Sequence, residues 1–202
     1  MALLPSLFAF FILFLSLSHS ARCTTAASRS GTPGDLVRSS CIHASYPNLC
    51  LRTLSSYTGS TRTANDLARA AVTVSLSRAR AVSGCIARLA KLHGGSKRQQ
   101  GALRDCVEQL SDSVDELRET LAELRHLRRG SFRWQMSNAE TWVSAALTNE
   151  DTCLDGFEKV DGKVKLAVRR KINNVARVTS NALYFINRLD ESHGRAQAAF
   201  DP

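Results

Sequence analysis

The sequence predicts an all-α fold: an up-down-up-down four-helix bundle that follows a small N-terminal helical element. Apolar residues recur at steps of three and four along several long stretches, which is the period of an amphipathic helix. No segment has the alternation or the β-branched runs of a sheet, and the short connections place neighbouring helices antiparallel. The 202 residues suffice for one domain with an ordinary core.

Residues 1–23 have the pattern of a secretory signal peptide. An apolar run from about Leu3 to Leu17 precedes small and polar residues, and cleavage is expected between about Ser20 and Ala27. The run is shorter than the roughly 20 apolar residues that span a bilayer, so no stable membrane insertion is expected. Because no Lys or Arg precedes the run, a signal anchor stays an alternative.

Two short regions precede the predicted bundle. Residues 24–34 are rich in Ser, Thr, Gly and Pro and are expected to be a flexible segment that leads into the fold. Residues 35–60 contain Pro47 between Cys41 and Cys50, which favours short helical pieces over one long helix. The two cysteines are close enough in sequence to close a small loop by a disulfide.

The bundle is expected to occupy residues 61–191. Its first helix runs from about Thr63 to Leu92 and ends at Gly94 and Gly95. One face of this helix carries the apolar positions, with Arg78 as a gap: Leu67, Ala71, Val74, Val82, Ile86 and Leu89.

The second helix has the clearest apolar stripe in the chain, made of Leu103, Cys106, Leu110, Val114, Leu117, Leu121 and Leu124. Its opposite face is acidic, and Arg118 and Arg125 lie at nearby turns, which predicts a solvated face with some ion pairs. Nothing apolar surrounds these acids to raise a pKa, so a catalytic carboxylate pair is not expected. The acids are Asp112, Asp115, Glu116, Glu119 and Glu123.

The third helix lies within residues 138–157, "NAETWVSAALTNEDTCLDGF", and ends in a turn at Cys153. Its predicted core positions are Val143, Ala146 and Leu147. The last helix has a stripe formed by Val164, Val168, Ile172, Val175, Val178, Ala182, Ile186 and Leu189. Residues 192–202 follow as a polar tail.

An exported chain places its cysteines in an oxidising compartment, where they become disulfide candidates. Cys23 lies at the expected cleavage point, and the pairing of the remaining five is open at this level: Cys41, Cys50, Cys85, Cys106 and Cys153. No metal site is expected, because the chain has no Cys-x-x-Cys and because His43 and His93 have no usual zinc spacing.

The sequence favours neither an enzyme nor a cofactor-binding protein. It lacks the G-x-S-x-G, H-E-x-x-H, P-loop and dinucleotide-binding patterns, and its histidines are scattered. Glu150, Asp151 and Asp155 lie close together, but Cys153 and Leu154 interrupt the alternation that a calcium loop needs. No catalytic residue, metal or cofactor is therefore expected.

The formal net charge of +9 points to polyanionic neighbours, which for an exported chain are acidic polysaccharides or anionic membrane surfaces. Nucleic-acid binding is not expected, because the basic residues are spread along the helices beside acids rather than gathered with aromatics on one face.

Four separated motifs together resemble the plant invertase and pectin methylesterase inhibitor family. They are "CIHASYPNLC", "ALRDCVEQLSDSVDELRETL", "TWVSAALTNEDTCLDGF" and "VTSNALYFINRL", and they cover nearly the whole expected mature chain in the right order. The resemblance implies a secreted four-helix bundle preceded by a helical hairpin, with one disulfide inside the hairpin and one between the second and third bundle helices. These are Cys41 with Cys50 and Cys106 with Cys153. Cys85 is then a free, buried thiol, while an alternative pairing that includes it stays open.

The resemblance also implies an inhibitor that docks one-to-one over the pectin-binding cleft of pectin methylesterase and is not itself an enzyme. The region "RRGSFRWQMSN" lacks the Pro-Lys-Phe motif of many invertase inhibitors, which favours the esterase over acid invertase as the target. Thr152 matches a family position at the target interface, with a helix-capping or disulfide-flanking role as the alternative. Trp142 is expected to pack in the core.

The net charge and the family likeness together lead to further expectations. The basic surface is expected to associate weakly with acidic pectin through electrostatic attraction. Two alternative functions remain. One is inhibition of cell-wall or vacuolar invertase, and the other is binding without inhibition, as in a detached esterase pro-region. Secretion to the apoplast and cell wall is the expected localisation.

Overall fold

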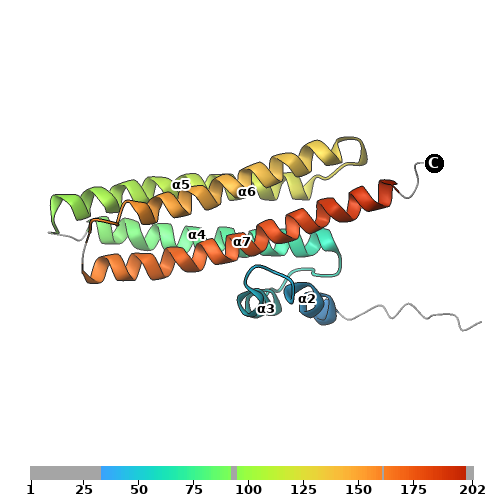
Figure 1. Cartoon of the computed structure of the whole chain (residues 1–202), viewed down its shortest axis with the longest axis horizontal. Helices are drawn as coiled ribbons and strands as arrows, with labels where there is room; N and C mark the ends of the chain where they lie inside the picture. The colour runs from blue at the N-terminus through green and yellow to red at the C-terminus, as the bar shows by residue number, and fades with distance from the viewer. Residues whose placement is uncertain (1–32, 92–94, 161, 199–202) are drawn as a thin grey trace, which may run out of the picture. The chain divides into compact units, whose positions relative to one another are not determined.

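The structure, a computed structural model, describes residues 33–91, 95–160 and 162–198, and these residues form helices and connecting turns with no strand among them. The predicted signal peptide and residues 24–32 lie outside the described residues. Two short helices, α2 (Pro33–Cys41) and α3 (Pro47–Ser55), precede four long ones (Figure 1). The long helices are α4 (Ala64–Lys91), α5 (Lys97–Arg125), α6 (Phe132–Asp155) and α7 (Lys163–Ala198).

The four long helices form the predicted up-down-up-down bundle. Each packs against two others, α4 against α5 and α7, and α6 against α5 and α7, so the four enclose a common core. Consecutive long helices run in opposite directions (Figure 1). Among the described helices, none combines the length and the apolar character that crossing a bilayer requires.

Helix starts follow local hydrogen-bonding rules. At the start of α4, the Asp66 N–H donates to Thr63 Oγ1 over 3.0 Å and the Thr63 N–H donates to Asp66 Oδ2 over 3.2 Å, a reciprocal capping arrangement. At the start of α5, Ser96 Oγ accepts a hydrogen bond from the Gln99 N–H over 3.2 Å. The three-and-four stripes then decide which side of each helix is buried.

The core consists of two apolar clusters. The larger one combines residues of all four long helices with residues of α2 and α3. The smaller one surrounds a disulfide between α5 and α6 and takes members from α4, α5, α6, α7 and the turn after α6, including Ile86, Leu103, Leu110, Phe157, Val168 and Ile172. The predicted stripes of the second and last helices contribute to both clusters and supply half of the smaller one.

Helix α6 differs from the prediction at both ends. It begins at Phe132 rather than near Asn138, after a single 3-10 turn at Arg129–Ser131. It also continues through Cys153 to Asp155, so the expected turn at Cys153 is wrong. The physical reason is that Cys153 itself occupies a buried position on the helix face, and the chain leaves the helix only at Gly156. Val143 and Ala146 are buried as predicted, whereas Leu147 is only half-buried.

Helix α7 is longer than predicted. It continues past residue 191 to Ala198, so the first part of the expected polar tail is helical. His193 lies on this extension and its ring packs edge-on against Phe132, with 3.8 Å between ring centroids.

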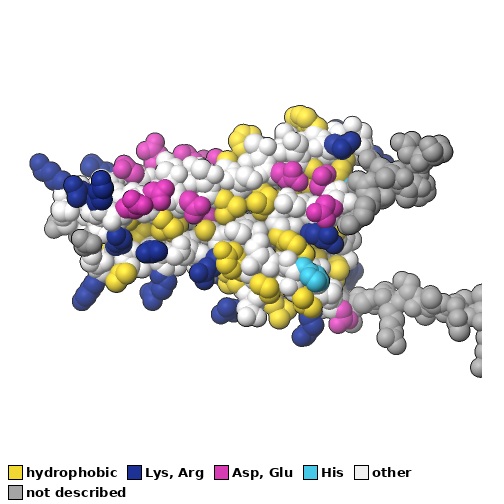
Figure 2. Space-filling model, in the orientation of Figure 1, with side chains coloured by type: hydrophobic (Ala, Val, Ile, Leu, Met, Phe, Trp, Pro, Cys, Tyr) yellow, Lys and Arg dark blue, Asp and Glu magenta, His cyan; other side chains and the backbone are white. Residues whose placement is uncertain are grey.

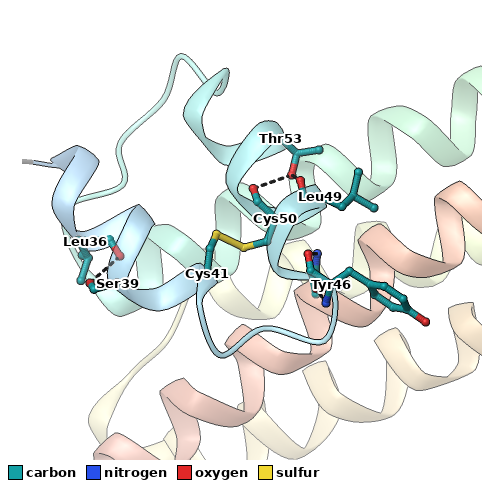
Figure 3. Close-up of a disulfide and its surroundings, with 8 residues drawn as sticks. Leu36, Ser39, Cys41, Tyr46, Leu49, Cys50 and Thr53 are labelled. Atoms are coloured by element: carbon teal, nitrogen blue, oxygen red, sulfur yellow. Dashed lines mark hydrogen bonds between the residues drawn. A yellow bond between two sulfur atoms is a disulfide. The ribbon is translucent and has the colours of Figure 1, made fainter.

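Helices α2 and α3 form the implied hairpin, and a disulfide joins Cys41 to Cys50 at its closed end (Figure 3). Both cysteines are buried. The hairpin packs against α4 and α7. Its connection to α7 is specific: Asn181 Oδ1 accepts from the Tyr46 N–H over 2.8 Å, and Asn181 Nδ2 donates to the Tyr46 carbonyl over 3.2 Å.

Asn181→Ala is expected to lower the free energy of unfolding by about 1–3 kcal/mol, because two backbone groups of Tyr46 lose their partner at a largely buried site. Hydrogen exchange should become faster across the hairpin and stay unchanged in α5 and α6. Asn187→Ala on the exposed side of the same helix is the matched control and should change neither quantity. Equal exchange rates in the two variants would contradict the docking role of Asn181.

Candidate functional site

The part of the chain that the structure describes contains no cluster of side chains able to hold a metal ion. Groups of three or more His, Cys, Asp or Glu side chains able to hold a metal are absent from these residues. The described histidines lie on separate elements: His43 follows α2, His126 follows α5 and His193 is on α7.

Glu150 is the one described acid whose pKa moves far, yet it faces the core and not a cleft. Burial raises the pKa of its carboxyl to about 8, despite hydrogen bonds from Ser113 and Thr179 that act in the opposite direction. Both hydroxyls lie 3.0 Å from Glu150 Oε1, and Oε2 has no hydrogen-bond partner among the described residues. This trio joins α5, α6 and α7 inside the bundle and has a structural role.

The exposed side of α6 carries a row of threonines. Thr141, Thr148 and Thr152 are all exposed, and each hydroxyl donates to the carbonyl four residues before it, over 2.8, 3.1 and 2.8 Å respectively. These bonds hold each side chain in one orientation and leave the hydroxyl oxygen free to accept a hydrogen bond from outside. The row is therefore a preordered, uncharged polar surface.

Thr152 belongs to this row and does not cap the helix. It lies inside α6, which ends at Asp155, and it directly precedes the buried Cys153. The disulfide from Cys153 to Cys106 on α5 has a Cα–Cα distance of 4.3 Å. The threonine row is thus attached to a part of α6 that is covalently fixed to its neighbour.

Trp142 is not a core residue, and that expectation is wrong. Its side chain is 39% exposed, because Val143 takes the neighbouring core position. Trp134, near the start of α6, is 65% exposed. Exposed tryptophans of this kind are enriched at protein interfaces.

Two asparagines of α6 flank Trp142 along the edge that meets α5. Asn138 Nδ2 donates to Glu123 Oε1 and Asn149 Nδ2 donates to Glu116 Oε2, each over 2.9 Å. Burial raises the pKa of Glu116, and the charges of Asp112 and Asp115 add to that shift, while the Asn149 hydrogen bond opposes it. The predicted pairing of α5 acids with nearby arginines is present for Arg118 and Asp115.

Together these residues define an α5–α6 face: Glu116, Glu119 and Glu123 from α5, and Asn138, Thr141, Trp142, Thr148, Asn149 and Thr152 from α6. Acidic side chains gather over α5 and α6 in the upper part of Figure 2, and basic ones at its left end. The sequence identifies the threonines and Trp142 only as residue types. The structure adds that they share a surface with the acids of α5.

Cys85 is a free cysteine on α4, and its side chain is half-buried rather than buried. It is not part of the α5–α6 face, to which α4 contributes no residue.

The fold and this face define a class of protein: helical bundles braced by disulfides that present a preordered polar surface. The chain belongs to the plant invertase/pectin methylesterase inhibitor family, whose sequence model matches residues 35–185.

Individual relatives agree with this membership. Pectinesterase inhibitor 3 of Arabidopsis thaliana is 50% identical, over 92% of this chain and 94% of its own length. Pectinesterase inhibitor 9 of the same plant is 42% identical, over 90% and 93%. The crystal structure of a mutant form of a pectin methylesterase inhibitor from Arabidopsis aligns with 73% of this chain and 92% of its own, with a TM-score of 0.61 at 22% identity, which shows the shared fold.

Proposed function

We propose that this protein is a secreted inhibitor of pectin methylesterase and has no catalytic activity of its own. The observation that carries the proposal is the 50% identity to a pectinesterase inhibitor over nearly the full length of both chains. The described residues support it through a rigid, braced surface that can cover another protein's cleft.

The proposed mechanism is occlusion by a one-to-one complex, with the α5–α6 face directed at the pectin-binding cleft. Rigid helices lose little conformational entropy on docking. The threonine row offers hydrogen-bond acceptors that are already oriented, and Trp142 offers a large contact area beside them. In this arrangement Thr152 contacts the esterase near the disulfide that holds its helix.

The target is best tested by direct titration. Purified mature protein is added in increasing amounts to a plant pectin methylesterase and, separately, to an acid invertase, with complex formation followed by size-exclusion chromatography. Inhibition of the esterase at one-to-one stoichiometry is the expected result. Inhibition of invertase alone would overturn the proposal, and complex formation without inhibition would favour the pro-region-like alternative.

That last alternative has a specific observation behind it. The chain is 31% identical to a longer protein of Arabidopsis thaliana named pectinesterase/pectinesterase inhibitor 3, of which it spans 27%. The names of the relatives above favour the esterase over invertase as the partner.

The double variant Thr148→Arg/Thr152→Arg is expected to weaken esterase inhibition at least tenfold, because two long cations replace oriented hydroxyls on the docking face. Ala81→Arg/Asn187→Arg adds the same charge at exposed positions of α4 and α7 and should inhibit like the parent. Inhibition constants from esterase assays decide the outcome. Equal constants for both variants would place the interface elsewhere without affecting the choice of target.

We also propose export to the cell wall, through the signal peptide expected at residues 1–23, and a weak electrostatic association with acidic pectin there. The net charge of +9 supports the association, which should weaken as salt screens the charges. Retention of the protein on pectin-containing matrix at rising sodium chloride concentration measures it.

A further inference from the structure

A groove of about 460 Å³ runs between α4 and α5, away from the α5–α6 face. Leu76, Leu121 and Ala122 contribute apolar surface to it, and Thr73 and Ser77 add two hydroxyl side chains from α4. Three arginines complete the lining: Arg80 from α4, and Arg118 and Arg125 from α5.

Three arginines line the groove, and no Asp or Glu is among its lining residues. Arg118 is paired with Asp115 in an exposed ion pair three residues apart, which has little strength in water. Arg80 and Arg125 form no ion pair among the described residues. Two guanidinium groups and a partly neutralised third therefore face the same hollow.

Further arginines follow Arg125 along the chain. The chain leaves α5 at this residue and passes through Arg128 and Arg129 to Arg133 at the start of α6, and all three side chains are exposed. Trp134 follows at once and is 65% exposed. Along the chain, the groove residue Arg125 is thus followed by three exposed arginines and an exposed tryptophan.

We propose that this groove and the adjoining turn bind a linear anionic carbohydrate polymer that carries a carboxylate on each sugar unit. Guanidinium groups pair with carboxylates through two parallel hydrogen bonds, and a row of them suits a chain with repeated carboxylates. The threonine and serine hydroxyls match sugar hydroxyls, and the indole of Trp134 offers an apolar plane for the face of a sugar ring.

Binding of such a polymer is an activity beyond inhibition. Its consequence for where the inhibitor accumulates rests on the proposed function. Pectin methylesterase converts methyl esters of the polymer into carboxylates. A site that prefers carboxylates would therefore concentrate the inhibitor where the esterase has already acted. The three arginines of the groove itself are not part of the α5–α6 face.

The test uses the full mature protein and no esterase. Binding of polygalacturonate of defined length is titrated in calcium-free buffer through tryptophan fluorescence and calorimetry, beside highly methyl-esterified pectin of the same length. Arg80→Gln/Arg118→Gln/Arg125→Gln is compared with Arg104→Gln/Arg169→Gln/Arg170→Gln, which removes the same charge from exposed positions elsewhere. Matching circular dichroism and urea unfolding show that both variants are folded.

We expect the groove variant to bind polygalacturonate at least tenfold more weakly than the parent and the control variant to stay within about threefold. We also expect the esterified polymer to bind more weakly than the acidic one. Equal losses in both variants would overturn the site in favour of diffuse charge attraction. If single-stranded DNA of matched length bound equally well and depended on the groove arginines in the same way, the assignment of a carbohydrate as the ligand would be overturned.

Esterase inhibition by the same variants, assayed on the methyl-esterified polymer, separates this inference from the proposed function. Loss of polygalacturonate binding with unchanged inhibition is the expected pattern for the groove variant. A parent protein that inhibits the esterase but fails to bind polygalacturonate would overturn the groove alone. A parent that binds the polymer without inhibiting would overturn the proposed function alone.

Discussion

Replacing Cys106 and Cys153 together by alanine is expected to lower the free energy of unfolding by about 4 kcal/mol. The disulfide joins residues separated by 47 positions, and in the chain-entropy model a loop of that length restricts the unfolded chain by about this amount. Both cysteines are also buried in the smaller core cluster, so their loss removes packing between α5 and α6. Urea unfolding at one pH measures the change, and the midpoint of thermal unfolding should fall by roughly 8–16 °C.

The hairpin disulfide provides the matched comparison. Cys41→Ala/Cys50→Ala opens a loop of only 9 residues and is expected to lower the free energy of unfolding by about 2–3 kcal/mol. Its effect on hydrogen exchange should be confined to α2 and α3, whereas loss of the bundle disulfide should affect α5 and α6. Both variants carry Cys85→Ala, so that the free thiol cannot exchange with an oxidised pair. A loss below about 1 kcal/mol for the Cys106 and Cys153 variant would contradict the bracing role.

The architecture could be predicted from the sequence because the bundle depends on periodicity alone. The stripe from Leu103 to Leu124 needs no knowledge of its partner, since a helix with one apolar face must bury that face. The start of α6 could not be predicted in the same way. Gln135 is buried there because its side chain bonds Arg128 N, Ser131 Oγ and the His126 carbonyl, and such a three-way contact has no sequence period.

The candidate site was predictable only in part. The family resemblance, not the sequence pattern, indicates Thr152 as an interface residue. Its orientation toward solvent depends on the fact that α6 continues through Cys153. The expectation that Trp142 packs in the core rests on its residue type alone. On that helix the buried stripe is already formed by Ala139, Val143 and Ala146. Extending that stripe by four residues leads to Glu150, so the burial of this acid had a signal in the sequence.

Glu150 should make the bundle less stable as the pH rises. Its carboxyl is fully buried, burial raises its pKa to about 8, and no hydrogen-bond partner among the described residues meets Oε2. Thr179 Oγ1 lies within reach of both Glu150 Oε1 and the Val175 carbonyl, but it has one proton to donate. When Thr179 donates to Val175, a protonated Glu150 can donate to Thr179 in return, which an ionised one cannot.

The sign of the effect follows from proton linkage. In the unfolded chain Glu150 loses its proton near its ordinary pKa of about 4.3, while in the folded chain it keeps the proton until about pH 8. Between these values the folded state binds more protons than the unfolded state. The free energy of unfolding therefore falls by about 1 kcal/mol per pH unit across this window and levels off on either side.

Glu150→Gln removes this dependence, because glutamine keeps the shape and the Oε1 acceptor but cannot ionise. Urea unfolding at pH 4, 6 and 8 should give similar stabilities for parent and variant at pH 4 and a variant more stable by several kcal/mol at pH 8. Glu140→Gln is the matched control on the same helix: burial also raises the pKa of Glu140, with a contribution from Asp190, but its carboxyl is only partly buried. A parent–variant difference that stays constant from pH 4 to pH 8 would show that Glu150 is already ionised in the folded chain. The expected result instead makes the contribution of Glu150 to stability largest under acidic conditions, where the buried carboxyl is neutral.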